Sequence, residues 1–257
     1  MSERAPHEMP PVGDATLRAR MDERARDDPH HPFLVFDGRT YTFGEIDAAA
    51  NRLANALLAQ GLAKGDRIAL MLPGHPEHII AILALAKAGF VRVSVNVHLI
   101  GAALEHFFAE FAPRALLVDT QYAEQLAPIG AAQRVEKIFW RGARDEFGAL
   151  LDFHDATPPR VAPAADDIIA LTPSSGTTGP PKGVLKSDRT LRAGPTGTLR
   201  LTGARPGDVF FLWESLHHGA GVAVVIAAIL EKITLAMVER FSASRFWDEV
   251  QIGRAHV

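Results

Sequence analysis

The chain has 257 residues, 47% of them hydrophobic and 22% charged, an ordinary composition for a soluble globular protein of one large domain or two modest ones. The formal net charge of −3 gives no reason to expect nucleic acid or an anionic membrane as a partner. The absence of cysteine excludes disulfides, thiolate catalysis and cysteine zinc sites, and it is compatible with a cytoplasmic location. The most apolar stretch, residues 219–230, is shorter than the about 20 residues that a spanning helix needs, so it is predicted to be a buried helix or strand.

The N-terminal part of the chain is predicted to begin with a lead-in segment, residues 1–31, that contains one short helix. Two short strands then flank a turn at Asp37 and Gly38. Thr42 and Glu45 have the spacing of a capping box, in which each side chain bonds the other residue's backbone N–H. Apolar residues recur at helical spacing behind this box, which predicts a helix.

Strands and helices then alternate with short connections as far as residue 140. Strands are predicted at 67–72, 90–95, 115–119 and 137–140, and helices at 76–89 and 101–111. This order favours β-α-β units and a mostly parallel sheet with helices on its faces.

A proline- and alanine-rich stretch, residues 156–167, is predicted to be an exposed crossing between two halves of the domain. The second half is expected to contain strands at 168–172, 183–187, 208–213 and 232–238. A helix is predicted to follow the second of these strands with Asp188 as its cap, and a closing helix is predicted near its end with Ser242 or Ser244 as its cap.

The loop between the first two strands of the second half carries the strongest chemical signal. It reads "LTPSSGTTGPPKGVLKS" and places hydroxyls and glycines directly before Lys182. Glycines let the backbone turn sharply, and successive backbone N–H groups in such a turn form a concavity for an anion. A lysine adds a positive point charge suited to phosphate. The loop is therefore predicted to hold a polyphosphate, with a plain polar linker as the alternative.

A mononucleotide-binding loop of the form G-x-x-x-x-G-K-[ST] does not fit this segment. Counted from Gly176, the second glycine would fall on Pro181, and Gly183 stands where a serine or threonine should follow the lysine. The residues after Lys182 also indicate a strand, whereas that motif opens a helix whose N-terminus holds the phosphate.

The run "SSGTTGPPKG", from Ser174 to Gly183, resembles the phosphate-binding loop of the adenylate-forming superfamily. That superfamily includes acyl- and aryl-CoA synthetases, firefly luciferase and the adenylation domains of peptide synthetases. The stretch from Tyr41 to Phe90 is similar to the opening of acyl-CoA synthetases, and "GDVFFLWESLHHGAG" is similar to a later block in which His217 stands at the family's histidine. Glu and Ser replace the proline expected before that histidine. The likeness extends over residues 32–250.

This resemblance implies an α/β fold, namely the first part of the large N-terminal domain of adenylate-forming enzymes, with mostly parallel sheets and flanking helices. It implies an ATP-dependent carboxylic acid:CoA ligase that uses ATP, Mg²⁺ and coenzyme A, with a small carboxylic acid and coenzyme A as partners and no nucleic acid. It implies that the phosphates are bound by Ser174, Ser175, Gly176, Thr177, Thr178, Gly179 and Lys182. Of these, Thr177 and Lys182 are the expected catalytic residues.

Different locations are predicted for His217 and for the pair His75 and His78. By the resemblance His217 is a candidate for lining or positioning the acid, with a partly buried core histidine as the alternative. His75 and His78, in "HPEH", have no third metal ligand in sight and are predicted to lie on the surface at the start of a helix. No metal-binding residue is predicted within the chain.

The resemblance stops before the family's later motifs, since the segments that hold adenine, ribose and magnesium lie beyond this C-terminus. Residues 251–257, "QIGRAHV", break the pattern, and their back-translation matches a sequencing-adaptor sequence, so a non-native tail is expected. The chain is accordingly interpreted as an incomplete, inactive fragment whose apolar run Val222–Leu230 is exposed. The open alternatives are an adenylation domain of a peptide-synthetase-like enzyme and a non-catalytic, half-length nucleotide-binding or interaction protein.

Overall fold

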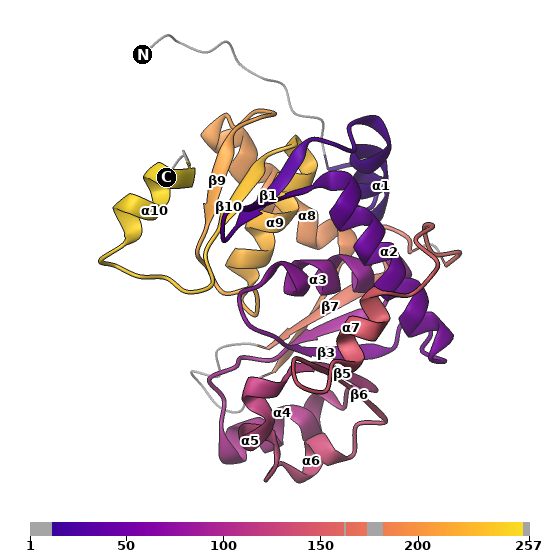
Figure 1. Ribbon diagram of the computed structural model, residues 1–257. Helices are drawn as coiled ribbons and strands as arrows, with labels where there is room; N and C mark the ends of the chain where they lie inside the picture. Colours follow the sequence, from indigo (N-terminus) through magenta and orange to yellow (C-terminus); the bar gives the residue numbers. More distant parts are fainter. Residues whose placement is uncertain (1–11, 162, 174–181, 254–257) are drawn as a thin grey trace.

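The computed structural model describes residues 12–161, 163–173 and 182–253, which form two β-sheets with helices around them (Figure 1). The smaller sheet has the strand order β2-β1-β10-β9 and the larger sheet has the order β6-β5-β3-β4-β7-β8. Most neighbouring strands run parallel, so the predicted α/β class with mostly parallel sheets is confirmed.

The larger sheet is built almost entirely by β-α-β connections. Its strands are β3 (Arg67–Met71), β4 (Val91–Ser94), β5 (Ala115–Asp119), β6 (Lys137–Arg141), β7 (Ile168–Pro173) and β8 (Gly183–Ser187). Helix α3 (Pro76–Ala88) connects β3 to β4, and α4 (Gly101–Phe111) connects β4 to β5. Only the β7–β8 pair is antiparallel, as its short connection requires.

Alternate residues of the strands face two separate hydrophobic cores, as the period of a β-strand dictates. In β3, Ile68 and Leu70 pack into the larger core with α3 and α2 (Phe43–Ala59), whereas Ala69 and Met71 pack into a second core with α4. Figure 1 shows α4 on one side of this sheet and α3 on the other. Because β3 is buried on both faces, successive residues along it are apolar, and this continuous apolar run is the pattern from which the strand was predicted.

The smaller sheet combines two strands from the N-terminal part of the chain with two strands from its C-terminal part. Strands β1 (Pro32–Phe36) and β2 (Arg39–Thr42) form the predicted antiparallel pair about the Asp37-Gly38 turn. β1 also pairs in parallel with β10 (Thr234–Met237), which pairs in parallel with β9 (Val209–Leu212). Helix α10 (Phe246–Gly253) lies against β9 on the outer face of this sheet.

Helix ends follow the expected chemistry at two positions and depart from it at a third. The capping box of Thr42 and Glu45 is present at the start of α2, and Gly89 ends α3 in the left-handed conformation that glycine adopts without strain. The prediction of Asp188 as a cap was wrong, because Ser187 caps α8 (Asp188–Thr202). Asp188 is instead buried, where its carboxylate accepts a hydrogen bond from the backbone N–H of Leu17 at 2.9 Å.

The sequence patterns missed several short helices that have too few turns to show a helical period. They are the 3₁₀ turn η1 (Thr120–Tyr122) and the helices α5 (Ala123–Leu126), α6 (Gly130–Gln133) and α7 (Glu146–Leu151). The 3₁₀ turn η1 follows β5 directly, and its residues Gln121 and Tyr122 help to form the edge of the cavity described below.

The apolar stretch near the C-terminal end forms a buried helix, α9 (Gly219–Glu231). We expected the face of Val222–Leu230 to be exposed, and this was wrong for most of its residues. Helix α8 and the N-terminal helix α1 (Leu17–Asp27) pack against it, and Val225, Ile226 and Ile229 are fully buried. No helix within the described ranges is long and apolar enough to cross a membrane.

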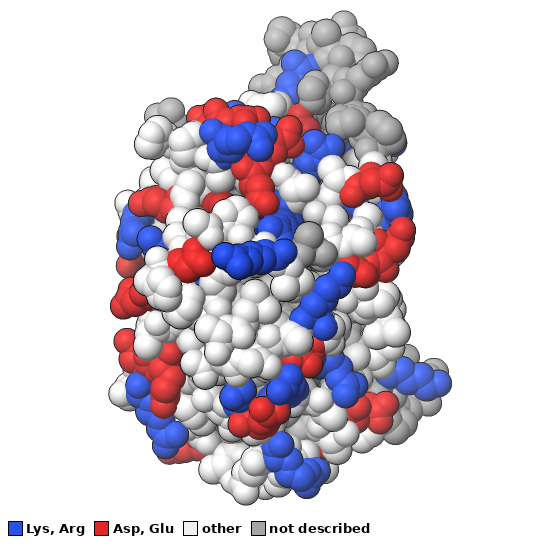
Figure 2. All heavy atoms as spheres, turned by 90° about the vertical axis from the view of Figure 1, so that its right-hand side faces the viewer, with Lys and Arg blue, Asp and Glu red and all other residues white. Residues whose placement is uncertain are grey.

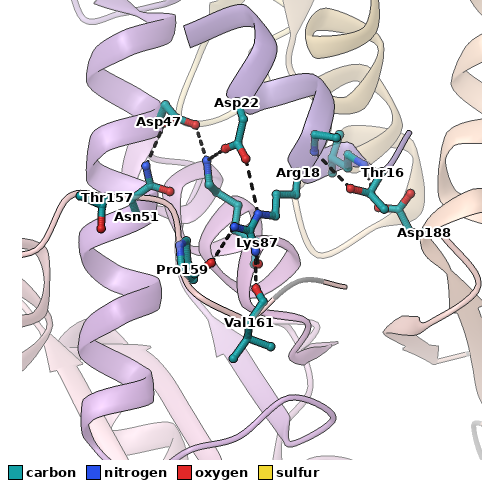
Figure 3. Close-up of polar contacts among 12 residues, drawn as sticks. Thr16, Arg18, Asp22, Asp47, Asn51, Lys87, Thr157, Pro159, Val161 and Asp188 are labelled. Atoms are coloured by element: carbon teal, nitrogen blue, oxygen red, sulfur yellow. Dashed lines mark hydrogen bonds and ion pairs between the residues drawn. The ribbon is translucent and has the colours of Figure 1, made fainter. Parts of the chain in front are cut away.

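A buried ion network lies where the predicted crossing, residues 156–167, contacts the N-terminal helices (Figure 3). Lys87 of α3 is 1% exposed and forms ion pairs with Asp22 of α1, at 2.5 Å, and with Asp47 of α2. Arg18 of α1 donates hydrogen bonds to the backbone carbonyls of Pro159, at 2.6 Å, and Val161. The crossing is therefore tied to the helical layer by side chains that lie far from it in sequence.

The surface carries both charges in mixture. On the face shown in Figure 2, Lys and Arg side chains alternate with Asp and Glu side chains, and no large area of one sign is visible. This distribution agrees with the small net charge of the sequence.

Candidate functional site

A cavity of about 940 Å³ lies where the carboxyl ends of strands from both sheets meet. Residues 72–74 follow β3, 97–98 follow β4, 121–122 follow β5, 213–218 follow β9 and 238–241 follow β10, and all of them line this cavity. In open α/β sheets, ligands bind in the crevice outside the carboxyl ends of the strands. The volume is also in the range of small-molecule sites. We therefore take this cavity as the candidate active site.

The two sheets approach each other closely at the cavity, and Gly74 permits this approach. A Cβ atom built at Gly74 would lie 2.5 Å from the backbone oxygen of Glu239, which follows β10 in the other sheet. No side chain fits at that distance, so a residue other than glycine would force the two walls of the cavity apart.

The predicted phosphate loop begins at the same sheet edge. β7 runs parallel to β4, so its last residue, Pro173, ends at the edge where the cavity lies. Residues 174–181 of the loop lie outside the described part of the chain, and they include the predicted phosphate-binding residues Ser174, Ser175, Gly176, Thr177, Thr178 and Gly179. Lys182 is exposed and directly precedes β8. Because a strand follows Lys182, where the mononucleotide motif requires a helix, that alternative is excluded.

His217 lies in the cavity wall, on the connection from β9 to α9, and is 9% exposed. Burial lowers the pKa of His217 to about 4, and the neighbouring rings of His218 and His98 contribute in the same direction. The ring centroids of His98 and His217 are 6.0 Å apart. The structure therefore places the predicted substrate residue in the cavity as a neutral imidazole at pH 7.

His78 was predicted to lie on the surface, and this was wrong. It is 1% exposed, lies on the inner face of α3 and contributes to the cavity wall. Burial lowers the pKa of His78 to about 3, with smaller contributions from the charge of Arg92 and from His217. The signal in the sequence was the apolar composition of α3 all around its axis, which indicates a fully buried helix.

Arg92 is a second buried polar residue that sequence reasoning missed. It lies on β4 between apolar neighbours, is 5% exposed, and burial lowers the pKa of its guanidinium to about 10. Its Nη1 atom has no hydrogen-bond partner among the described residues. An arginine between two valines, in a strand predicted to lie between two helices, was the signal that could have found it.

No cluster of three or more histidine, aspartate or glutamate side chains that could hold a metal ion is present among residues 12–161, 163–173 and 182–253.

Comparisons with known proteins agree with this architecture. Residues 21–257 match the family model described as AMP-binding enzyme. The medium/long-chain-fatty-acid–CoA ligase FadD6 of Mycobacterium tuberculosis is 32% identical over 95% of this chain and 42% of its own length. The 3-hydroxybenzoate–CoA ligase of Aromatoleum sp. is 33% identical over 77% of this chain and 41% of its own length.

A solved structure shares the fold. The N-terminal domain of FACL13 from Mycobacterium tuberculosis superposes with a TM-score of 0.85 at 24% identity, over 93% of this chain and 61% of that one. The chain spans about two fifths of the length of the two CoA ligases it matches. From the match of its residues 21–257, we conclude that the chain belongs to the AMP-binding enzyme family.

Proposed function

We propose that this chain is the N-terminal part of an ATP-dependent carboxylic acid:CoA ligase. The observation that carries the proposal is the common location of two features: the Ser-, Thr- and Gly-rich loop after β7 starts at the sheet edge where the cavity lies. A nucleotide and an acid would thus bind side by side. The relatives named above, both CoA ligases, support this reaction class.

The proposed reaction has two steps. A carboxylate oxygen of the acid attacks the α-phosphorus of ATP, the bond to the leaving pyrophosphate breaks, and an acyl-adenylate forms. The sulfur of coenzyme A then attacks the acyl carbon, its proton is lost, and AMP leaves. Such transfers depend mainly on orientation and on stabilisation of developing charge.

We assign roles to the chain's residues within this scheme. The backbone N–H groups and hydroxyls of residues 174–179 would bind the β- and γ-phosphates, with Thr177 among them, and Lys182 would neutralise their charge. His217 would line the acid site. We assign no Mg²⁺ ligand within the chain and derive no step from the metal.

We also propose a division of the chain. Residues 32–250 would form the adenylating part in two halves that cross near 156–167, and residues 1–31 would lead into it. Within the lead-in, Arg24 of α1 donates a hydrogen bond to the backbone carbonyl of Leu230 at 2.6 Å, so this segment is attached to the second half by direct contacts.

ATP–pyrophosphate exchange with a panel of aliphatic and aromatic acids tests the function. We expect exchange from a chain extended past Val250 by the sequence that follows in its gene, and none from residues 1–257 alone. Correct orientation of the reacting groups is worth roughly 7–11 kcal/mol of the barrier, and we expect the missing part to supply much of it. Failure of the extended chain to exchange with any acid would refute the proposal.

A further inference from the structure

One carboxylate of the cavity wall has no cation beside it. Glu214 follows β9, lines the cavity and is half-buried. It forms no ion pair with another described residue, and the donor to its carboxylate is its own backbone N–H. Neither of its carboxylate oxygens is among the buried atoms that lack a partner, so the carboxylate is open to the cavity. A ligand can therefore reach this group by displacing solvent.

The rest of the described lining does not balance the charge of Glu214. Burial raises the pKa of the Glu214 carboxyl, and no cation among the described residues opposes that rise. The other charged side chains in the described lining are Glu239 and Arg240, whereas His78 and His217 are neutral at pH 7. Two carboxylates therefore stand against one guanidinium. Next to Glu214, a ligand with only a negative charge would be repelled, and a positive group would be attracted.

Exposed aromatic rings lie on the same wall. Trp213, which directly precedes Glu214, is 43% exposed, and Phe241 is 50% exposed. Both line the cavity, and their ring centroids are 5.0 Å apart, so the two rings form one aromatic surface. The face of an aromatic ring attracts a cation, and tryptophan does so most strongly. An accessible carboxylate beside such rings is suited to an ammonium group.

We propose that the acid bound in this cavity is an amino acid, whose ammonium group pairs with the Glu214 carboxylate beside Trp213, and that this contact selects it over the same acid without the amino group. The proposal rests on the proposed function, because it assumes that the cavity is the acid site. The acid's own carboxylate would attack ATP, and the ammonium group would stay bound without reacting. Hydrogen bonds between two charged groups are roughly twice as strong as neutral ones, which gives the contact its selectivity.

Binding to the 257-residue chain tests the contact with acids that differ in the amino group. The probes are L-phenylalanine, 3-amino-3-phenylpropanoate and 3-phenylpropanoate, because the third has the same carbon skeleton without an amino group. We expect at least one of the two amino acids to bind at least about tenfold more tightly than 3-phenylpropanoate, which corresponds to about 1.4 kcal/mol. Equal affinities, or no binding of either amino acid, would overturn the proposal.

The ionisation of Glu214 reports the pair directly. The ¹³C resonance of its side-chain carboxyl follows its pKa, and Glu214→Gln assigns that resonance. A neighbouring positive charge favours the ionised form of a carboxyl, so the bound amino acid should lower the pKa of Glu214. The anion 3-phenylpropanoate should not lower it. A carboxyl that is protonated at pH 7 in the free chain, or a pKa that the amino acid leaves unchanged, would contradict the contact.

Variants of Glu214 separate its charge from its size. Glu214→Gln keeps the size without the charge, and it should abolish the preference while 3-phenylpropanoate still binds. Glu214→Asp keeps the charge and should retain part of the preference. Glu110→Gln, the same substitution at an exposed site of α4 outside the cavity lining, should keep the full preference. Full preference in Glu214→Gln would contradict the assignment; if that variant does not fold, the three probes on the unchanged chain still decide.

The failure of this proposal can be told apart from failure of the proposed function. In the extended chain, the ratio of kcat/KM for each amino acid to that for 3-phenylpropanoate measures selection, whereas exchange with any acid measures function. Equal kcat/KM values would overturn the selection and leave the function standing. If no acid supports exchange, the function fails, and binding to the 257-residue chain still decides whether Glu214 holds an ammonium group.

Discussion

Replacing Lys87 by methionine should destabilise the protein strongly. The Lys87 ammonium group is almost fully buried and forms ion pairs with Asp22 and Asp47 (Figure 3). Lys87→Met leaves two carboxylates without their shared cation, and breaking a buried pair in this way costs about 3–5 kcal/mol. We expect the lower end of that range, because Asp22 keeps Arg18 at 3.4 Å and Asp47 keeps the Asn51 amide at 2.9 Å.

Urea unfolding at pH 7 measures this cost. With a slope near the upper value for small proteins, about 3 kcal/mol per molar, the midpoint of Lys87→Met should fall by about 1 M. The matched control is Lys64→Met, because Lys64 pairs with Asp167 at 2.6 Å but both side chains are partly exposed. Pairs of this kind contribute at most about 1 kcal/mol, so its midpoint should move little.

A double variant tests the electrostatic explanation. Lys87→Met combined with Asp47→Leu removes a buried charge together with its partner, and it should be more stable than Lys87→Met alone, since apolar replacements of a buried pair are often neutral. The reasoning is refuted if the free energy of unfolding of Lys87→Met lies within about 1 kcal/mol of the wild-type value. It is also refuted if adding Asp47→Leu to Lys87→Met lowers the free energy of unfolding by as much as Asp47→Leu does in the wild type.

Three further predictions concern the candidate site. The folded-state pKa of His217 lies below its ordinary value near 6.5, so the unfolded chain binds more protons and stability should fall as the pH drops from about 6.5 towards 4. Ring ¹³C shifts should show His217 neutral at pH 6.5 and titrating near pH 4, and a titration near 6.5 would contradict this. Gly74→Ala should lower the melting temperature and the free energy of unfolding, the latter by about 1–3 kcal/mol, because the new Cβ would meet the backbone of Glu239. The control is Gly197→Ala in α8, whose Cβ would meet nothing and which should raise the free energy of unfolding by up to about 1 kcal/mol. Equal effects of the two substitutions would contradict the close approach at Gly74. Lys182→Ala and Thr177→Ala should slow pyrophosphate exchange in the extended chain while their unfolding free energies change by no more than about 0.5 kcal/mol, and full exchange in both variants would remove the assignment.

Much of this protein's architecture was predictable from the sequence, because the responsible forces act between near neighbours in the chain. Thr42 and Glu45 of the capping box are three positions apart, and the helices and strands up to residue 141 follow from apolar residues at their characteristic spacing. The alternation of these elements indicated a mostly parallel sheet. The predicted phosphate loop could be proposed for a similar reason, since its hydroxyls, glycines and lysine all lie within residues 174–183.

The tertiary structure alone decided which of these elements lie side by side and which polar residues are buried. β4 pairs with β7 and β1 pairs with β10, and no local pattern encodes such partners. The prediction that His78 lies on the surface failed because its burial depends on packing around α3. Lys87 forms ion pairs with Asp22 and Asp47, which lie on two other helices far from it in the sequence. The environment of a charged or polar side chain is set by groups that only the folded chain brings together, so its protonation and its partners follow from the fold and not from its own sequence.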